Sequence, residues 1–217
     1  SAWQAAADAH VAKPEAFDVD RLEDQATRIM DFFTRERIQQ MTQASEQPVE
    51  PLLVMGNPRS GTTLLDTILG MHPEVVSGGE LSIGAQLEGK LTPLLDSYLG
   101  YPECLAELRT QDANALAHTY SNAVGKLSQG RRFVTNKALN INMQYGFLRC
   151  VAPGMRTISL HRHPLDNCVS CFMSLIPMRG HGYVQDQEKM ARVWIARRKL
   201  QDHWAEVMTE DPILQLH

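Results

Sequence analysis

Residues 52–65, L-L-V-M-G-N-P-R-S-G-T-T-L-L, constrain the fold more than any other segment of the chain. Four apolar residues predict a buried strand, the glycines and proline predict a tight turn, and the residues after them predict a helix. Glycine lets a backbone approach a ligand closely, and amides at a helix N-terminus point free N–H donors at an anion. The segment therefore predicts a phosphate-binding loop.

The loop differs from that of nucleoside-triphosphate-binding proteins in the position of its cation. Their motif is G-x-x-x-x-G-K-[ST], with the lysine on the outer phosphates and the hydroxyl on magnesium. The spacing from Gly56 to Gly61 fits, but Thr62 replaces the lysine and the cation is Arg59, inside the loop. The alternative interpretation is a glycine-containing turn that only connects a strand to a helix.

The composition limits the class of protein. The chain has 217 residues, of which 43% are hydrophobic and 21% charged, which is typical of a soluble domain with its own core. The net charge of -4 argues against nucleic-acid binding and gives no attraction to a membrane surface. No apolar run approaches the ~18 residues of a spanning helix. We therefore expect a cytoplasmic protein without a nucleic-acid or membrane partner.

The four cysteines form no disulfide framework, which fits a reducing compartment. Cys168 and Cys171 make a C-x-x-C pattern, but they fall inside the apolar run 167–173, which predicts a helix. We interpret them as small core residues rather than as a redox pair.

Predicted strands and helices alternate along the chain. Strands are expected at 52–55, 75–80, 133–137, 156–161 and 213–216, and helices at 17–41, 64–71, 141–151 and 185–208, with another opening at His163-Pro164. Residues 81–129 are expected to be mostly helical, with breaks at Pro93 and at 100–102. The fold class is therefore α/β, a three-layer, phosphate-loop-like parallel sheet with helices on both faces. Residues 1–48 are expected to be a lead-in helical segment and linker, and 49–217 the main domain, truncated at its C-terminus.

Polar residues follow four of the predicted strands. They are the loop 57–63, Glu80, Lys137, and Arg162 with Ser170 in the helix after it. In an open parallel sheet, ligands bind beyond the carboxyl ends of the strands, so we expect these residues to converge there.

The P-R-S-G-T-T loop resembles that of the sulfotransferases that use 3′-phosphoadenosine 5′-phosphosulfate (PAPS), in which it wraps the 5′-phosphate beside the transferred sulfuryl group. Arg162 and Ser170, eight residues apart in L-H-R-H-P-L-D-N-C-V-S-C-F, resemble the arginine and serine that hold the 3′-phosphate. A planar guanidinium and a hydroxyl suit phosphate oxygens. The resemblance thus implies these nucleotide-binding residues: Asn57, Pro58, Arg59, Ser60, Gly61, Thr62, Thr63, Arg162 and Ser170.

The resemblance also implies three catalytic residues. Glu80, in S-G-G-E-L, falls where tyrosylprotein sulfotransferases place the general base that takes the proton of the acceptor. Lys137, in V-T-N-K, resembles the lysine that steadies charge on the departing oxygen, and Arg59 would assist it. The alternative interpretation of Glu80 is a solvated turn residue, and that of Lys137 is a surface lysine at the end of a strand.

The chain is most similar to bacterial sulfotransferases that carry tetratricopeptide repeats, through G-x-P-R-S-G-T-T-L-L, H-P-E-V with G-G-E-L, and a late helix with H-W near its end. Two residues depart from that pattern. Asn57 stands where small or apolar residues are commoner, and His163 replaces an aspartate. His161 and His163 have the spacing of a metal chelate, but no further ligands accompany them, and we expect no metal site.

We therefore predict a sulfotransferase that moves a sulfuryl group from PAPS to an acceptor hydroxyl or amine by in-line displacement, with release of 3′-phosphoadenosine 5′-phosphate and no required metal. The acceptor is left open among protein, sugar and small molecule. Two alternatives are a phosphate-loop kinase, disfavoured by Thr62, and a non-catalytic nucleotide-binding module, disfavoured by Glu80 and Lys137.

Overall fold

The strand that precedes the loop, β1 (Glu50–Gly56), is the middle strand of the sheet. The computed structural model describes residues 1–45, 50–174 and 180–217, and within them five strands form a parallel sheet in the order β2-β3-β1-β4-β5. The other strands are β2 (Val75–Val76), β3 (Phe133–Asn136), β4 (Arg156–Leu160) and β5 (Leu214–Leu216). The second strand is shorter than predicted, because residues 77–80 turn away from the sheet.

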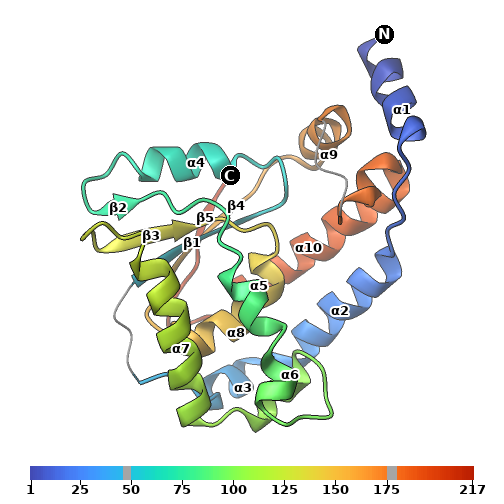
Figure 1. The fold of residues 1–217 in the computed structure, drawn as a ribbon. Helices are drawn as coiled ribbons and strands as arrows, with labels where there is room; N and C mark the ends of the chain where they lie inside the picture. Colours follow the sequence, from blue (N-terminus) through green and yellow to red (C-terminus); the bar gives the residue numbers. More distant parts are fainter. Residues whose placement is uncertain (46–49, 175–179) are drawn as a thin grey trace.

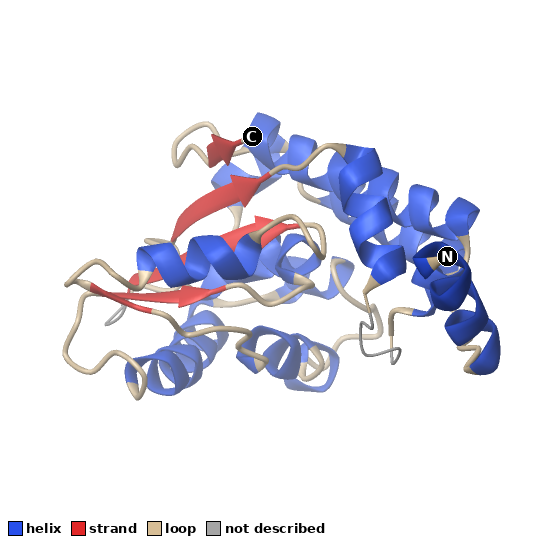
Figure 2. Cartoon of the chain, turned by 90° about the horizontal axis from the view of Figure 1, so that it is seen from above, coloured by secondary structure: helices blue, strands red, loops and turns tan. Residues whose placement is uncertain are grey.

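Helices cover both faces of this sheet. Helix α4 (Thr62–Leu69) lies over one face, and α7 (Thr110–Gly125) and α8 (Ile141–Val151) lie below the other (Figure 1). Seen from above, α4 lies over the sheet and runs roughly along its strands (Figure 2). Both α4 and α8 pack against β1. The predicted α/β fold with a parallel sheet flanked by helices is therefore confirmed.

Helix α8 is the centre of the main core. All eleven of its residues are buried, because β1, α5 (Ile83–Glu88), α7 and α10 (Gln187–Val207) surround it. Gly146 allows the ring of Phe33 to lie against the helix, since a Cβ there would be 2.2 Å from that ring. Trp204 of α10 closes the packing and donates its indole N–H to the carbonyl of Asn142 at 2.7 Å.

The N-terminal region contains three helices where one was predicted. They are α1 (Ala2–Ala12), α2 (Val19–Phe32) and α3 (Arg35–Gln40). Asp18 caps α2 by accepting from the amide of Arg21 at 2.9 Å. The continuous helix over 17–41 is wrong, because Thr34 leaves the helical conformation and caps α3 through the amide of Arg37.

The region between β2 and β3 is helical, as predicted, with one correction. Pro93 lies inside α6 (Leu91–Leu94) rather than at a break, because the first turn of a helix has no intrahelical partner for its amides. A 3₁₀ helix, η1 (Glu103–Glu107), follows the predicted break at 100–102. The linker expected before β1 reaches into residues 46–49, which lie outside the described residues.

Two elements complete the second half of the chain. Helix α9 (Pro164–Met173) begins with Pro164 at its first position, and the 3₁₀ helix η2 (Gly182–Gln185) leads into α10. Cys168 and Cys171 lie on α9 and all four cysteines are free. Burial raises the pKa of the Cys171 thiol to about 11, which fits its interpretation as a core residue.

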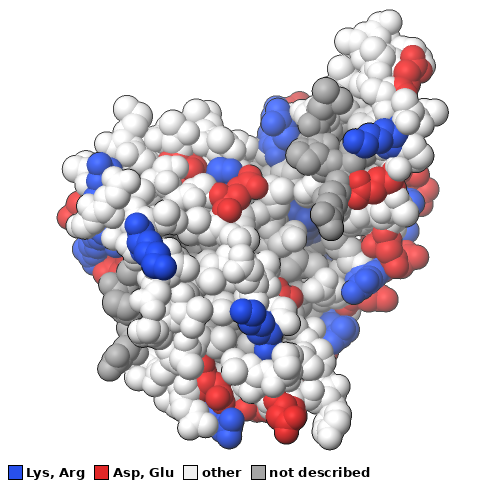
Figure 3. Space-filling view, viewed as in Figure 1, with Lys and Arg blue, Asp and Glu red and all other residues white. Residues whose placement is uncertain are grey.

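Charges of both signs are interspersed over the face shown in Figure 3, without a large area of one sign. None of the helices in the described ranges is both long and apolar enough to cross a bilayer.

Replacing Gly146 with alanine should destabilise the fold. The added methyl group would force the fully buried ring of Phe33 to move, and such overpacking costs about 1–3 kcal/mol. The matched control is Gly100→Ala, where an added Cβ meets nothing within 4 Å and the melting temperature should stay unchanged. Equal melting temperatures for both variants in thermal denaturation would contradict this packing.

Candidate active site

The backbone of the loop after β1 is shaped to receive an anion. Arg59 and Gly61 have positive φ angles of 69° and 105°, the left-handed conformation from which anion-binding nests of amides are built. The first amides of α4, at Thr62 and Thr63, have no preceding turn to bond to. Gly56 cannot carry a side chain, because a Cβ would lie 2.5 Å from the hydroxyl of Ser60 and 2.8 Å from the side chain of Thr62.

Two polar side chains of the loop are buried without a partner among the described residues. They are the hydroxyl of Ser60 and the carbonyl oxygen of Asn57, in residues 8% and 6% exposed. An unsatisfied buried polar atom costs free energy. A hydroxyl at the mouth of an anion-binding loop gains a partner when a phosphate oxygen accepts a hydrogen bond from it. The loop therefore fits a phosphate group.

Three predicted residues meet on one side of the loop. Arg59 donates from Nε to the Ser170 hydroxyl of α9 at 3.2 Å. Arg162, just after β4, donates from Nη1 to the carbonyl of Arg59 at 2.8 Å. The latter bond supports Arg59 in a backbone conformation that is costly for a side-chain-bearing residue. Two guanidinium groups and a hydroxyl thus form a cationic cluster beside the loop.

Asn167 is a positioning residue that the sequence analysis missed. Its side-chain N–H donates to the carbonyl of Pro58 at 2.8 Å, and the thiol of Cys171 donates to the same oxygen at 3.4 Å. Both residues are buried on one face of α9. The signal in the sequence was a polar residue four positions before a buried cysteine, in line with it on the helix.

Glu80 and Lys137 form an ion pair on the other side of the loop. The Lys137 ammonium donates to Oε1 of Glu80 at 2.9 Å, with the lysine side chain 9% exposed and the glutamate 54%. The pairing follows from the backbone, because the amide of Lys137 donates to the carbonyl of Gly79. The buried ammonium can stabilise negative charge that develops on a bound ligand, and the solvent-accessible carboxylate can contact that ligand.

The order of the strands separates the two groups. Leu53 pairs with Asn136 of β3 on one side, and Gly56 pairs with Leu160 of β4 on the other. The loop therefore continues between the Glu80–Lys137 pair at the end of β3 and the cationic cluster at the end of β4. Among the described residues, no hydrogen bond links the two groups directly.

Arg197 of α10 is a second residue that the sequence analysis missed. It is 4% exposed and donates to the carbonyl of Leu139 at 3.1 Å and to the side-chain oxygen of Asn140 at 3.2 Å. It also lines a small cavity with Asn57 and Tyr183. A buried guanidinium thus holds the turn after Lys137 and shares a cavity with the loop. An arginine in line with the apolar positions of α10 was the available signal.

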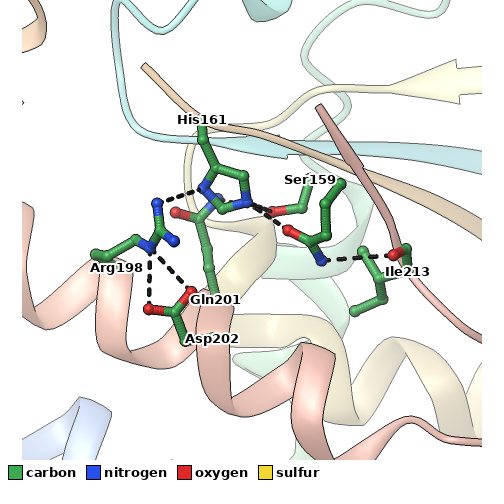
Figure 4. Close-up of polar contacts among 7 residues, drawn as sticks. Ser159, His161, Arg198, Gln201, Asp202 and Ile213 are labelled. Atoms are coloured by element: carbon green, nitrogen blue, oxygen red, sulfur yellow. Dashed lines mark hydrogen bonds and ion pairs between the residues drawn. The ribbon is translucent and has the colours of Figure 1, made fainter. Parts of the chain in front are cut away.

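His161, at the end of β4, is held by both neighbouring elements (Figure 4). Arg198 of α10, itself paired with Asp202, donates to Nδ1 at 3.1 Å. Because a guanidinium can only donate, the imidazole proton lies on Nε2, which donates to Gln215 of β5. The arrangement requires a neutral imidazole. Its burial lowers the pKa of His161, and the Arg198 charge acts in the same direction. His163 is exposed at the start of α9.

Acidification should therefore lower the free energy of unfolding. A folded-state pKa below the ordinary value means that the unfolded chain binds the proton first, so stability falls as pH drops below about 6.5. Burial also lowers the pKa of His181 and of His203. The measurement is chemical denaturation at about pH 7.5 and about pH 5.5. Between these two pH values, the free energy of unfolding should fall less for His161→Gln than for the unmutated chain. Ser159→Ala, which removes a partner of the imidazole but no titratable group, should keep the full loss. Equal losses in all three proteins would contradict this role of His161.

Comparison with known proteins bears on the same residues. The model of the family described as "Sulfotransferase family" matches residues 51–217, from β1 through β5. The chain is similar to an uncharacterized protein of Aquifex aeolicus, with 28% identity over 185 residues, which is 82% of this chain and 24% of that protein. The chain thus spans about a quarter of the length of that relative. The family match covers the loop, both flanking groups and the whole sheet, and the chain belongs to the sulfotransferase family.

Proposed function

We propose that the chain transfers a sulfuryl group from PAPS to an acceptor hydroxyl or amine. The observation that carries the proposal is the cationic cluster of Arg59, Arg162 and Ser170 beside an anion-binding loop. A loop alone suits any nucleotide phosphate. A second group of phosphate-binding side chains next to it suits a nucleotide with two separate phosphates, and PAPS is such a nucleotide.

The loop and the cluster would each bind one phosphate of the nucleotide. The amides of Gly61, Thr62 and Thr63 and the hydroxyl of Ser60 would hold the 5′-phosphate, with Asn57 and Pro58 shaping the loop. Arg162 and Ser170 would hold the 3′-phosphate. Arg162 uses Nη1 on the carbonyl of Arg59, and its other N–H donors remain available to phosphate oxygens, since a guanidinium carries five.

PAPS supplies the sulfuryl group and a phosphate oxygen that departs with the electron pair of the broken S–O bond. Glu80 would take the proton of the acceptor as the acceptor oxygen or nitrogen bonds to sulfur. Arg59 and Lys137 would stabilise the negative charge left on the departing oxygen. Lys137 can act while it remains paired, because its ammonium has three donors and Glu80 accepts one.

The family assignment and Thr62 in place of the loop lysine favour this function over a phosphate-loop kinase. The carboxylate of Glu80 favours it over a non-catalytic nucleotide-binding module, since 54% of that side chain is exposed to an incoming acceptor. The proposed mechanism is that of the tyrosylprotein enzymes, with a glutamate base. A transfer assay with labelled PAPS and a panel of protein, sugar and small-alcohol acceptors would identify the acceptor.

Adenosine 3′,5′-bisphosphate should bind more tightly than AMP. The additional phosphate gains charge-assisted hydrogen bonds of about 1.5–3 kcal/mol, which corresponds to roughly tenfold to 150-fold in affinity. Arg162→Ala should remove most of this preference, so that the affinities for the two nucleotides come close to each other. Calorimetric titration of both nucleotides into both proteins measures it. Equal affinities in the unmutated protein would refute the proposed function.

Glu80→Gln should abolish turnover and keep nucleotide binding. The amide oxygen can still accept from Lys137 but cannot take a proton, and positioned bases contribute about 10²–10⁴-fold. The matched control is Glu74→Gln, an exposed glutamate after α4, which should turn over normally. Normal turnover by Glu80→Gln would show that Glu80 is only a turn residue.

A further inference from the structure

Asp66 is a buried carboxylate that neither the loop nor the flanking groups use directly. It lies on α4, five residues after Gly61, and is 3% exposed. Among the described residues it has no lysine, arginine or histidine in ion-pair contact. Instead, Ser77 donates its hydroxyl proton to Oδ2 at 2.5 Å, and Thr135 donates to Oδ1. Hydroxyl groups make strong hydrogen bonds to the oxygens of an aspartate side chain.

The two hydroxyl donors come from the two segments that carry Glu80 and Lys137. Ser77 begins the turn that follows β2, three residues before Glu80. Thr135 lies within β3, two residues before Lys137, and is 0% exposed. Asp66 therefore joins the helix that starts at the phosphate loop to both halves of the Glu80–Lys137 pair.

Thr135 extends the connection into the turn itself. Its hydroxyl oxygen accepts from the amide of Gly78 at 2.9 Å while its proton goes to Asp66. The contact is close, because a Cβ on Gly78 would lie 2.2 Å from the carbonyl of Thr135. Residue 78 must therefore be glycine for the turn to approach β3 this closely.

Two further hydrogen bonds fasten the turn to the end of β3. The side chain of Asn136 accepts from the amide of Leu81 at 3.2 Å, and the amide of Lys137 donates to the carbonyl of Gly79 at 2.9 Å. Three consecutive residues, 135–137, thus each form a hydrogen bond with the turn on which Glu80 lies. Glu80 and Lys137 are thus held next to each other, and the hydrogen bonds of Asp66 link their two segments to α4.

We propose that the hydrogen-bonded pair of Asp66 and Thr135 is a positioning device, which fixes Glu80 and Lys137 relative to the phosphate loop. Its consequence for turnover rests on the proposed function. In-line transfer requires the base, the acceptor and the bound phosphate to be aligned, and a displacement of about 1 Å costs about 10²-fold in rate. The pair touches no substrate, so its loss changes alignment rather than nucleotide binding.

The first test is amide hydrogen exchange of the free chain, which requires no activity. Thr135→Val keeps the shape and removes the hydroxyl. The amides of Gly78 and Lys137 should then exchange roughly threefold to tenfold faster, while the amide of Ser60, bonded to Asn57 within the loop, should be unchanged. Unchanged exchange at Gly78 and Lys137, or an equal increase at Ser60, would overturn the proposal.

The matched control for this variant is Thr157→Val. Thr157 is also a buried strand threonine, and its hydroxyl donates to Tyr145 at 3.1 Å, away from the turn. It should leave the exchange of Gly78 and Lys137 unaltered. Thr135→Ser, which keeps the hydroxyl, should restore the protection that Thr135→Val loses.

The second test is turnover in the presence of saturating PAPS, with the affinity for adenosine 3′,5′-bisphosphate measured in parallel. Asp66→Asn and Thr135→Val should each lower kcat about 10- to 100-fold at unchanged nucleotide affinity. The double variant should be no slower than the worse single one, since both remove the same link. The positioning role would be overturned if the kcat of the double variant fell by the product of the two single effects. A normal kcat in either single variant would overturn it as well. If the unmutated chain neither binds nucleotide nor turns over, the proposed function is refuted. The hydrogen-exchange result then still shows whether Thr135 holds the turn that carries Glu80.

Discussion

The pairing of β1 on both sides is the constraint on which the rest of the structure depends. β1 is hydrogen-bonded to β3 and to β4 in parallel, so its backbone groups are satisfied within the sheet and its side chains face helices on both faces. Parallel strands end at the same edge. The loop after β1 therefore emerges between the ends of its two neighbours, and every other part of the candidate site lies next to one of those ends.

Each of these ends is fixed by a buried polar side chain rather than by apolar packing alone. At the end of β4, His161 is held between α10 and β5. Near the end of β3, Thr135 is held by Asp66 of α4, and the following turn is held by Arg197. Hydrogen bonds have direction, whereas apolar contacts tolerate sliding, so such groups suit a site whose geometry must be kept.

The sequence predicted the parallel sheet and its helical cover, because the strands are short apolar runs and the helices have their own start and stop residues. The N-terminal helix was predicted as one element because its apolar spacing runs as far as Phe33, and the capping role of Thr34 was not recognised. Glu80 and Lys137 were each identified through resemblance. Their ion pair was not, because their segments lie 57 positions apart in the chain and only the pairing of β2 with β3 brings them together.

Asp66, Asn167 and Arg197 were missed for a common reason. Each is a polar residue on a helix, where the default expectation is a solvent-exposed position, and burial depends on what packs against that helix. Local chemistry was readable from the sequence alone: a glycine-bordered loop, a cation inside it, and an arginine and a serine whose spacing resembles that of the 3′-phosphate site of the PAPS sulfotransferases. Which of these groups share a side of the loop, and which buried side chains hold them there, was decided only by the tertiary structure, because strand order and helix packing are set by contacts between residues far apart in the chain.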